Sequence, residues 1–186
     1  TGDANAMRSF DTTPNFFQLR IEPYLLATAA KYPTLRPLFE TEATRLAQTR
    51  ECLVHGDFSP KNILASADRM VLLDCEVAWY GDPAFDVAFL LSHLFLKALF
   101  HAPRESGIKS MVEKFWSAYQ TQRPAAGLEP RVSRLLLILL LARVDGKSPV
   151  EYLSSAQQNF VRAFIRCELA TGHSSLAVIT EGWFAC

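Results

Sequence analysis

The chain has 186 residues, of which 49% are hydrophobic and 20% are charged. This length is enough for one domain with a sizeable hydrophobic core, and the composition is typical of a globular protein in water. Nineteen basic residues balance nineteen acidic ones, so the overall charge gives no support for nucleic-acid or membrane-surface binding.

The sequence shows no pattern of membrane insertion or export. Its longest strongly apolar run, residues 135–142, is far shorter than the roughly 20 residues that span a bilayer. The first ten residues lack the basic and apolar regions of a signal peptide. The four cysteines contain no C-x-x-C pair. We therefore expect free thiols in a reducing compartment, which favours the cytoplasm.

In chain order, helical patterns dominate. Residues 1–11 are small and polar and are expected to be a flexible end, followed by one helical domain over 12–186. The first helix is expected to start near Thr12 or Thr13, and Pro23 inside it predicts either two short helices or one kinked helix. Further helical patterns cover about 34–51, 83–101, 106–122, 130–144, 149–171 and 174–184.

Two of these helical segments carry polar residues that invite two interpretations. The helix at 83–101 is apolar on almost every side and is expected to be buried in the centre of the domain, so His93 within it is expected to pack. The stretch 143–147 either faces a substrate cleft or simply ends its helix. The residues Trp79, Tyr80, Trp116, Tyr119 and Trp183 either line a pocket for a cationic or planar ligand or, as we favour, belong to the core.

A β-hairpin interrupts the helices. Ile63–Ser66 and Met70–Leu73 are β-prone runs around a three-residue turn, which would place Asn62 opposite Asp74. A slip of one residue would instead place Asn62 opposite Leu73 or Cys75. Carboxylate and amide oxygens are ligands that Mg²⁺ prefers, so residues 62–76 are expected to form a metal-binding hairpin.

Asp57 lies in the loop 55–62 that leads into this hairpin, five residues before Asn62. A loop can place its carboxylate beside a metal without making it a ligand. A base that accepts a hydroxyl proton next to metal-bound phosphates is the arrangement of phosphoryl transfer. Without any family in view, the pattern therefore favours metal-assisted chemistry on a phosphate.

At this point the residues resemble a known family. His55-Gly56-Asp57 followed by Asn62 matches the H-x-D-x-x-x-x-N catalytic loop of the protein-kinase-like fold. The Gly after the His, then Asp74-Cys75-Glu76, Gly81-Asp82-Pro83 and Asp86-Val87-Ala88, are similar to the aminoglycoside phosphotransferase and choline kinase superfamily. The motifs cover about forty residues, and their joint order and spacing make the signal strong.

The resemblance implies roles for the four residues nearest the chemistry. Asp57 would be the catalytic base or would orient the acceptor hydroxyl. Asn62 and Asp74 would hold Mg²⁺ against the phosphates of ATP. Glu76 stands where choline-kinase-like members carry an acidic residue that helps with the metal. The acceptor would be a hydroxyl of a small molecule, such as an aminoglycoside, an amino alcohol or a sugar.

The resemblance also implies residues that support the catalytic loop. Asp86, on the buried helix, would hydrogen-bond the loop backbone, and His55 would brace the same loop. Asp82, before Pro83, is expected to cap the buried helix. Protein kinases carry a Lys two residues after the base, where this chain has Ser59. This argues against a protein kinase.

A kinase of this type has a second lobe, with a glycine-rich turn over the phosphates and a strand Lys. The eight glycines form no G-x-G-x-x-G turn, and the residues before His55 read as helical. We therefore expect a mainly α fold with a small β-hairpin, the helical C-terminal lobe of the kinase-like fold with the N-terminal β-lobe absent. The missing lobe of the same protein would be its partner. Alone, this lobe is expected to be inactive and to self-associate through exposed apolar surface.

Two other functions compete with a kinase. A non-catalytic binding or regulatory module would keep the scaffold without a nucleotide site, and an upstream lobe in the gene would argue against it. A metal-dependent phosphoesterase using His55, Asp57, Asp74 and Asp86 would hydrolyse a phosphate ester without ATP. The sequence predicts no acceptor, because specificity lies in helices that carry no recognisable code.

Overall fold

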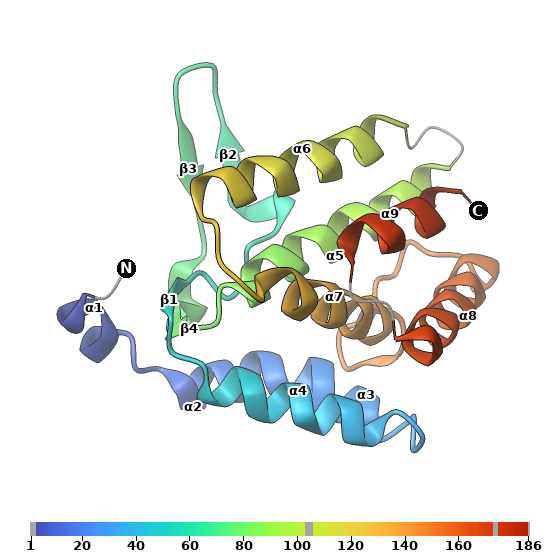
Figure 1. The fold of residues 1–186 in the computed structure, drawn as a ribbon, viewed down its shortest axis with the longest axis horizontal. Coiled ribbons are helices and arrows are strands. Elements are labelled where there is room, and N and C mark those ends of the chain that lie inside the picture. Colours follow the sequence, from blue (N-terminus) through green and yellow to red (C-terminus); the bar gives the residue numbers. More distant parts are fainter. Residues whose placement is uncertain (1–2, 103–105, 173–174, 186) are drawn as a thin grey trace.

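The computed structural model describes residues 3–102, 106–172 and 175–185, and it shows a mainly helical fold with two small antiparallel strand pairs, as predicted (Figure 1). The longer helices are α4 (Arg36–Gln48), α5 (Ala84–His101), α6 (Ser106–Gln122), α7 (Leu128–Asp145), α8 (Ser155–Thr171) and α9 (Leu176–Phe184). Shorter helical pieces are α1 (Ala4–Ser9), α2 (Thr13–Phe16), the π-helix η1 (Phe17–Leu26), α3 (Ala27–Ala29) and the 3₁₀ turns η2 (Pro60–Asn62) and η3 (Cys75–Val77). The strands are β1 (Cys52–Val54), β2 (Ile63–Ala65), β3 (Met70–Leu72) and β4 (Trp79–Gly81).

Helices α5 and α7 pack against each other and form the centre of the core (Figure 1). The run Leu135–Ala142 of α7 is completely enclosed, which explains why it is apolar all round. Length and hydropathy alone would also let α5 cross a membrane, but 67% of it is buried inside this fold. The apolar sequence of α5 is therefore used for core packing, as expected for a central helix.

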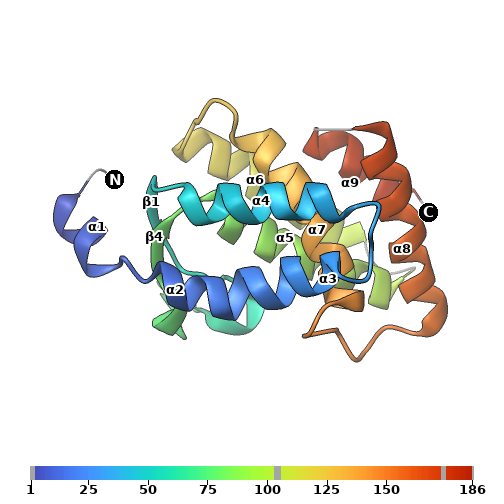
Figure 2. The ribbon, with the colours of Figure 1, turned by 90° about the horizontal axis from the view of Figure 1, so that it is seen from below.

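The N-terminal segments form one continuous rod from Thr13 to Ala29, which lies alongside α4 (Figure 2). Of the two predicted alternatives, the chain keeps a single helical path through Pro23. The middle of the rod is a π-helix, in which the Ala27 amide donates to the Glu22 carbonyl five residues back. A π-helical segment changes the hydrogen-bond ladder at a residue that has no N–H to contribute, which is how Pro23 is accommodated.

Residues 4–9, which lie in the segment expected to be a flexible end, are helical in the structure. These residues form α1, because the Asp3 carboxylate caps the helix by accepting hydrogen bonds from the Asn5 and Ala6 amides. No side chain of α1 is buried, so the helix adds little to the core.

Helix α8 starts at Ser155 rather than near 149, since Ser154 and Gln157 form a reciprocal capping box there.

The strand pair β1–β4 was not predicted from the sequence. It pairs Leu53 with Tyr80 and joins segments that are separated by the whole catalytic loop and hairpin. Its strands are only three residues long, and Trp79 is fully buried against Phe16 with ring centroids 3.8 Å apart. The pair fixes both the entry to the catalytic loop and the entry to α5.

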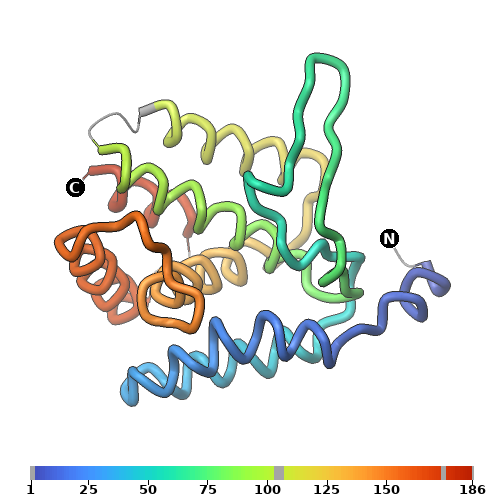
Figure 3. Tube along the Cα trace, turned by 180° about the vertical axis from the view of Figure 1, so that it is seen from behind, coloured from blue at the N-terminus to red at the C-terminus, as the bar shows by residue number. Residues whose placement is uncertain are grey.

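The predicted register of the β2–β3 hairpin is wrong by one residue. Ala65 pairs with Met70, and the Leu73 amide donates to the Asn62 carbonyl at 2.9 Å, so Asn62 lies opposite Leu73 rather than Asp74. The turn contains four residues, not three. The Ser66 hydroxyl donates to Asp68 at 2.6 Å and the Ser66 amide to the Arg69 carbonyl, which closes the longer turn. The hairpin projects from the helical body (Figure 3).

Candidate functional site

The catalytic loop is held by its backbone from the first turn of α5. The two carboxylate oxygens of Asp86 accept hydrogen bonds from the His55 amide at 2.7 Å and the Gly56 amide at 2.9 Å. Helix α5 is buried along most of its length, so this anchor is fixed by the core. The structure therefore ties the position of the loop directly to a central, largely buried helix.

Gly56 is required by the close approach of two segments. Its backbone is left-handed, with φ of 77°, and an added Cβ would lie 2.5 Å from the Val77 carbonyl oxygen in η3. A larger residue would have to displace that backbone, because only glycine takes this conformation without steric cost. This explains the glycine between the His and the Asp of the motif.

The His55 ring connects the loop to the hairpin. Its Nδ1 accepts a hydrogen bond from the Asp57 amide at 3.2 Å. Its Nε2 therefore carries the ring proton and donates to the Leu73 carbonyl at 2.8 Å. This pattern describes a neutral imidazole with its proton on Nε2. His55 thus links the backbone at Asp57 to the backbone at Leu73, the residue before Asp74.

The Asp57 carboxylate lies between two cations and an amide. It is 3.3 Å from Lys61 Nζ, 3.6 Å from a guanidinium nitrogen of Arg20 and 3.0 Å from Asn62 Nδ2. Arg20 also donates from Nε to the Gly56 carbonyl at 2.5 Å. Sequence reasoning missed Arg20, because it comes from η1 and no local pattern connects it to the loop.

Asn62 and Asp74 can supply oxygen ligands to a cation, although not through the predicted pairing. The Asn62 amide nitrogen binds the backbone and side chain of Asp57, which leaves the amide oxygen as the group for a metal. Asp74 follows β3 in a left-handed conformation with φ of 57°, and it is exposed, as is Glu76. The left-handed backbone turns the chain sharply between the hairpin and η3.

These donors fit Mg²⁺ only as part of a larger ligand set. Within the described residues, no three His, Cys, Asp or Glu side chains gather closely enough to hold a metal by themselves. Magnesium is commonly bound by one or two protein groups together with substrate phosphates and water. The oxygen donors at 62, 74 and 76 therefore suit a cation that arrives with a nucleotide.

Asp82 is fully buried and joins three helices. Its carboxylate forms ion pairs with Arg45 of α4 and, at 3.0 Å, with Arg131 of α7. It also accepts a hydrogen bond from the Ala84 amide at 2.9 Å, at the start of α5. Asp82 thus anchors the helix that carries Asp86 and supports the catalytic loop only through that helix.

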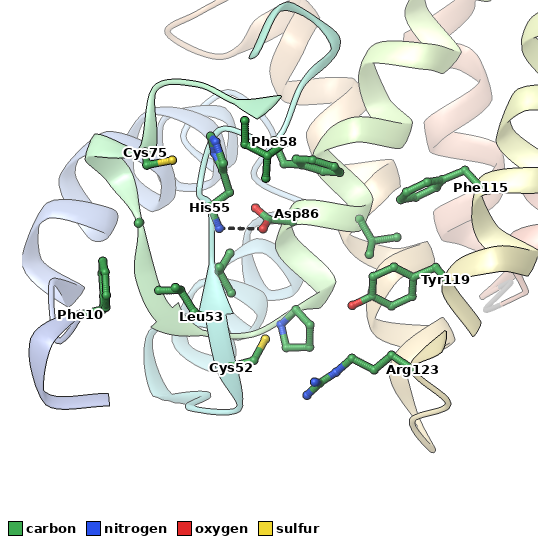
Figure 4. A pocket seen from close by; sticks show the side chains of 15 residues that line it. Phe10, Cys52, Leu53, His55, Phe58, Cys75, Asp86, Phe115, Tyr119 and Arg123 are labelled. Carbon is green, nitrogen blue, oxygen red and sulfur yellow. Dashed lines mark hydrogen bonds between the residues drawn. The ribbon is translucent and has the colours of Figure 1, made fainter. Parts of the chain in front are cut away.

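A cavity of about 560 Å³ lies behind the loop (Figure 4). His55 and Asp86 form one wall, and Tyr119 and Arg123 face them from the side of α6. Most other lining side chains are apolar. Of the aromatic residues considered for a pocket, Tyr119 lies here, whereas Trp79, Tyr80 and Trp183 are buried in the core.

Asp86 should make the stability of the fold depend on pH. Burial raises the pKa of its carboxyl from 3.8 to about 6, although the bonds from the His55 and Gly56 amides oppose this. Between about pH 4 and pH 6 the folded chain holds a proton here that the unfolded chain has released. The resulting stabilisation is complete below pH 4 and is lost as the pH rises through 6, by about 3 kcal/mol in total.

Urea unfolding of the wild type and of Asp86→Asn at pH 4, 5, 6 and 7 measures this effect. The free energy of unfolding of the wild type relative to the variant should fall as the pH rises, because asparagine does not titrate. A difference that is constant across this range would show that the Asp86 carboxyl titrates alike in the folded and unfolded chains.

A base on a short loop, next to oxygen donors for a phosphate-bound cation, defines the class of phosphoryl-transfer proteins with a kinase-like helical lobe. A sequence profile described as "Phosphotransferase enzyme family" matches residues 7–111, more than half of the chain. The chain belongs to this phosphotransferase family. The match confirms the resemblance to the aminoglycoside phosphotransferase and choline kinase superfamily.

Two of the curated relatives that the chain resembles are methylthioribose kinases. Methylthioribose kinase of Exiguobacterium sibiricum is 35% identical over 133 residues, which cover 70% of this chain and 32% of that protein. The methylthioribose kinase of Bacillus pumilus is 33% identical over 96 residues, covering 48% of this chain and 22% of that protein. The chain therefore spans about a fifth to a third of the length of these relatives.

Proposed function

We propose that this chain is the catalytic and acceptor-binding lobe of an ATP- and Mg²⁺-dependent kinase that phosphorylates a hydroxyl group of a small molecule. The observation that carries the proposal is the position of Asp57. Its carboxylate accepts a hydrogen bond from Asn62 Nδ2 and is 15% exposed, on a loop whose backbone amides are held by Asp86. The family of the chain supports the same reaction type.

In this reaction an acceptor hydroxyl oxygen attacks the γ-phosphorus of ATP, and the bond from that phosphorus to the ADP oxygen breaks. Asp57 accepts or orients the hydroxyl proton as the new bond forms. Asn62 and Asp74, with Glu76 nearby, would hold Mg²⁺, which neutralises charge on the phosphates. His55 and Asp86 keep the loop in place, and their hydrogen bonds to the backbone favour this role over the metal ligation that a phosphoesterase would need from them.

A sugar-like acceptor is favoured by the relatives, which are named methylthioribose kinases. We also propose the cytoplasm as the location, because the described cysteines, Cys52, Cys75 and Cys167, are free thiols.

The exposed hairpin carries the apolar surface that supports the proposal of a second lobe. Leu64 is 56% exposed and Met70 is 65% exposed, and Val71, Leu72 and Leu73 are exposed beside them. Apolar side chains gathered in this way commonly mark a surface that another unit covers. We propose that the nucleotide-binding lobe of the same protein covers it, and that a second copy of the chain does so when that lobe is missing.

The 186-residue chain alone is expected to transfer no phosphate at a measurable rate. In kinases the glycine-rich turn and the strand Lys that contact the ATP phosphates come from the other lobe, and water at an open site weakens each electrostatic contact. The measurement is ADP release and titration calorimetry with Mg²⁺-ATP across a panel of sugars. A polypeptide extended upstream by the coding sequence should gain activity, and Asp74→Ala in that polypeptide should abolish it.

Two results would contradict the proposal. Robust ADP release by the 186-residue chain alone would show that its nucleotide site is complete. An extended polypeptide that binds ATP and still phosphorylates no hydroxyl compound would favour a regulatory module.

A further inference from the structure

A group of basic and aromatic side chains adjoins Asp57 on the side of η1. The Arg20 guanidinium lies 5.9 Å from the centroid of the Phe89 ring, and the same arginine lies 3.6 Å from the Asp57 carboxylate. The rings of Tyr24 and His93 meet Phe89 edge-on, at centroid distances of 5.7 and 5.1 Å. The guanidinium of Arg143, from α7, lies 6.0 Å from the Tyr24 ring. We call this set the Phe89 cluster: Arg20, Tyr24, Phe89, His93 and Arg143.

The charge in and around the Phe89 cluster is predominantly positive. Burial lowers the pKa of His93 to about 4, so its ring is neutral near pH 7. The field of Arg143, Lys61 and Lys97 lowers the same pKa further, and Asp57 alone among the named contributors raises it. Three cations and one carboxylate, that of Asp57, thus act on His93.

Arg20 and Lys61 are paired with the Asp57 carboxylate, whereas Lys97 and Arg143 are held by groups that do not neutralise them. Lys97 lies 4.0 Å from the centroid of the Tyr152 ring, and Arg143 donates to the Ser148 carbonyl at 2.7 Å. Acidic residues on the same elements are paired elsewhere. Glu22 of η1 binds Lys147, and Asp145 of α7 binds Arg162, in each case at 2.8 Å.

The aromatic faces are also already occupied. Arg20 covers Phe89, Arg143 lies over Tyr24 and Lys97 lies over Tyr152. Phe89 and Tyr24 are buried, so the side chains that a ligand would meet here are the cations that cover these rings. A cationic ligand would meet like charge on approach, whereas hydroxyl, carboxylate and phosphate oxygens could accept hydrogen bonds from these cations.

We propose that the Phe89 cluster, with Lys61 and Lys97, forms the acceptor-binding surface beside Asp57, and that it selects hydroxyl compounds without positive charge. Anionic sugars bind more tightly than neutral sugars, and polyamine sugars of the aminoglycoside type are excluded. This inference rests on the proposed function only in taking Asp57 as the group that the acceptor hydroxyl approaches.

The test measures direct binding to the 186-residue chain, with the NMR signals of the His93 ring as the readout. The probes are D-ribose 5-phosphate, D-ribose and kanamycin at low ionic strength, without ATP. Ribose 5-phosphate should shift the His93 signals at the lowest concentration, ribose at a higher one, and kanamycin should leave them unchanged. Raising the salt from about 20 to 200 mM should weaken the ribose 5-phosphate binding severalfold, because exposed charges are screened.

A charge-reversal pair identifies the residues responsible. Lys97→Glu should weaken ribose 5-phosphate binding about five- to tenfold, as expected for reversing one partly exposed charge within several ångströms. Lys114→Glu, on an exposed position of α6 and not among the charges that act on His93, should change nothing. A thermal melt checks that both variants fold.

The inference is overturned if kanamycin shifts the His93 signals at a concentration as low as ribose 5-phosphate does. It is also overturned if no sugar shifts them, or if both lysine variants bind alike. These outcomes do not depend on phosphoryl transfer. An enzyme that binds the probes in the expected order and never uses ATP would refute the proposed function and leave the binding surface intact.

Discussion

Replacing Asp57 by asparagine is expected to lower kcat by about 10²–10⁴-fold while leaving the affinity for ATP nearly unchanged. The substitution removes the oxygen that accepts the hydroxyl proton but keeps the size of the side chain. Asn62 and Asp74, which are expected to hold the metal and the phosphates, remain in place. The effect should therefore fall on the chemical step, in a polypeptide that supplies both halves of the ATP site.

Steady-state kinetics with an identified acceptor, together with the Kd for Mg²⁺-ATP, separates the two quantities. The matched control is Asp68→Asn, the same chemical change on the exposed hairpin turn, where Asp68 contacts the Ser66 hydroxyl. The control should keep wild-type turnover. If Asp57→Asn also keeps it, Asp57 is not the base, and the positions of Arg20 and Lys61 beside it would need another explanation.

The helical architecture could be predicted because its signals are local. The apolar sequence of residues 84–101 indicated a central buried helix, and the structure packs it against α7. The catalytic loop could be located because the order His55, Asp57, Asn62 depends on short-range spacing alone. The glycine between His55 and Asp57 has a cause that spacing does not reveal, namely the 2.5 Å approach of the Val77 carbonyl.

The features that sequence reasoning missed depend on contacts between distant segments. Cys52–Val54 pairs with Trp79–Gly81, two strands too short to show a β pattern of their own. Arg20 reaches Gly56 across 36 positions of sequence. The hairpin register failed for a smaller reason: one extra residue between the strands moves every pairing, and the turn is closed by local bonds from Ser66 to Asp68 and Arg69.

For the candidate site, too, one part of the prediction agrees with the structure and another part does not. The donors at Asn62 and Asp74 were inferred from a cross-strand pairing that the structure does not contain. Their oxygens remain available for a different reason: the Asn62 amide nitrogen is used by Asp57, and the left-handed backbone at Asp74 turns the chain after β3. A motif can thus indicate the residue types of a site while an argument from strand geometry about the same residues fails.

The largest expected effect on stability comes from Asp82→Ala, which should lower the free energy of unfolding by about 3 kcal/mol and the Tm by about 6–12 °C. The substitution leaves the Ala84 amide without its acceptor and removes a buried countercharge from Arg45 and Arg131. Breaking a buried ion pair typically costs about 3–5 kcal/mol. The lower end is expected here, because Arg45 keeps Glu42 and Arg131 keeps Glu51 as partners.

Two comparisons separate the causes of that loss in urea unfolding. Asp82→Asn keeps an oxygen for the Ala84 amide and removes the charge, so its cost should lie between those of the wild type and Asp82→Ala. Glu22→Ala breaks the Lys147–Glu22 pair, whose side chains are 60% and 47% exposed, and should cost less than about 1 kcal/mol. If Asp82→Ala costs no more than Glu22→Ala, desolvation of the buried charges cancels their attraction. Helices α4, α5 and α7 would then be held together by apolar packing and the Glu42–Arg134 ion pair, and the anchor of the catalytic loop would not depend on the Asp82 carboxylate.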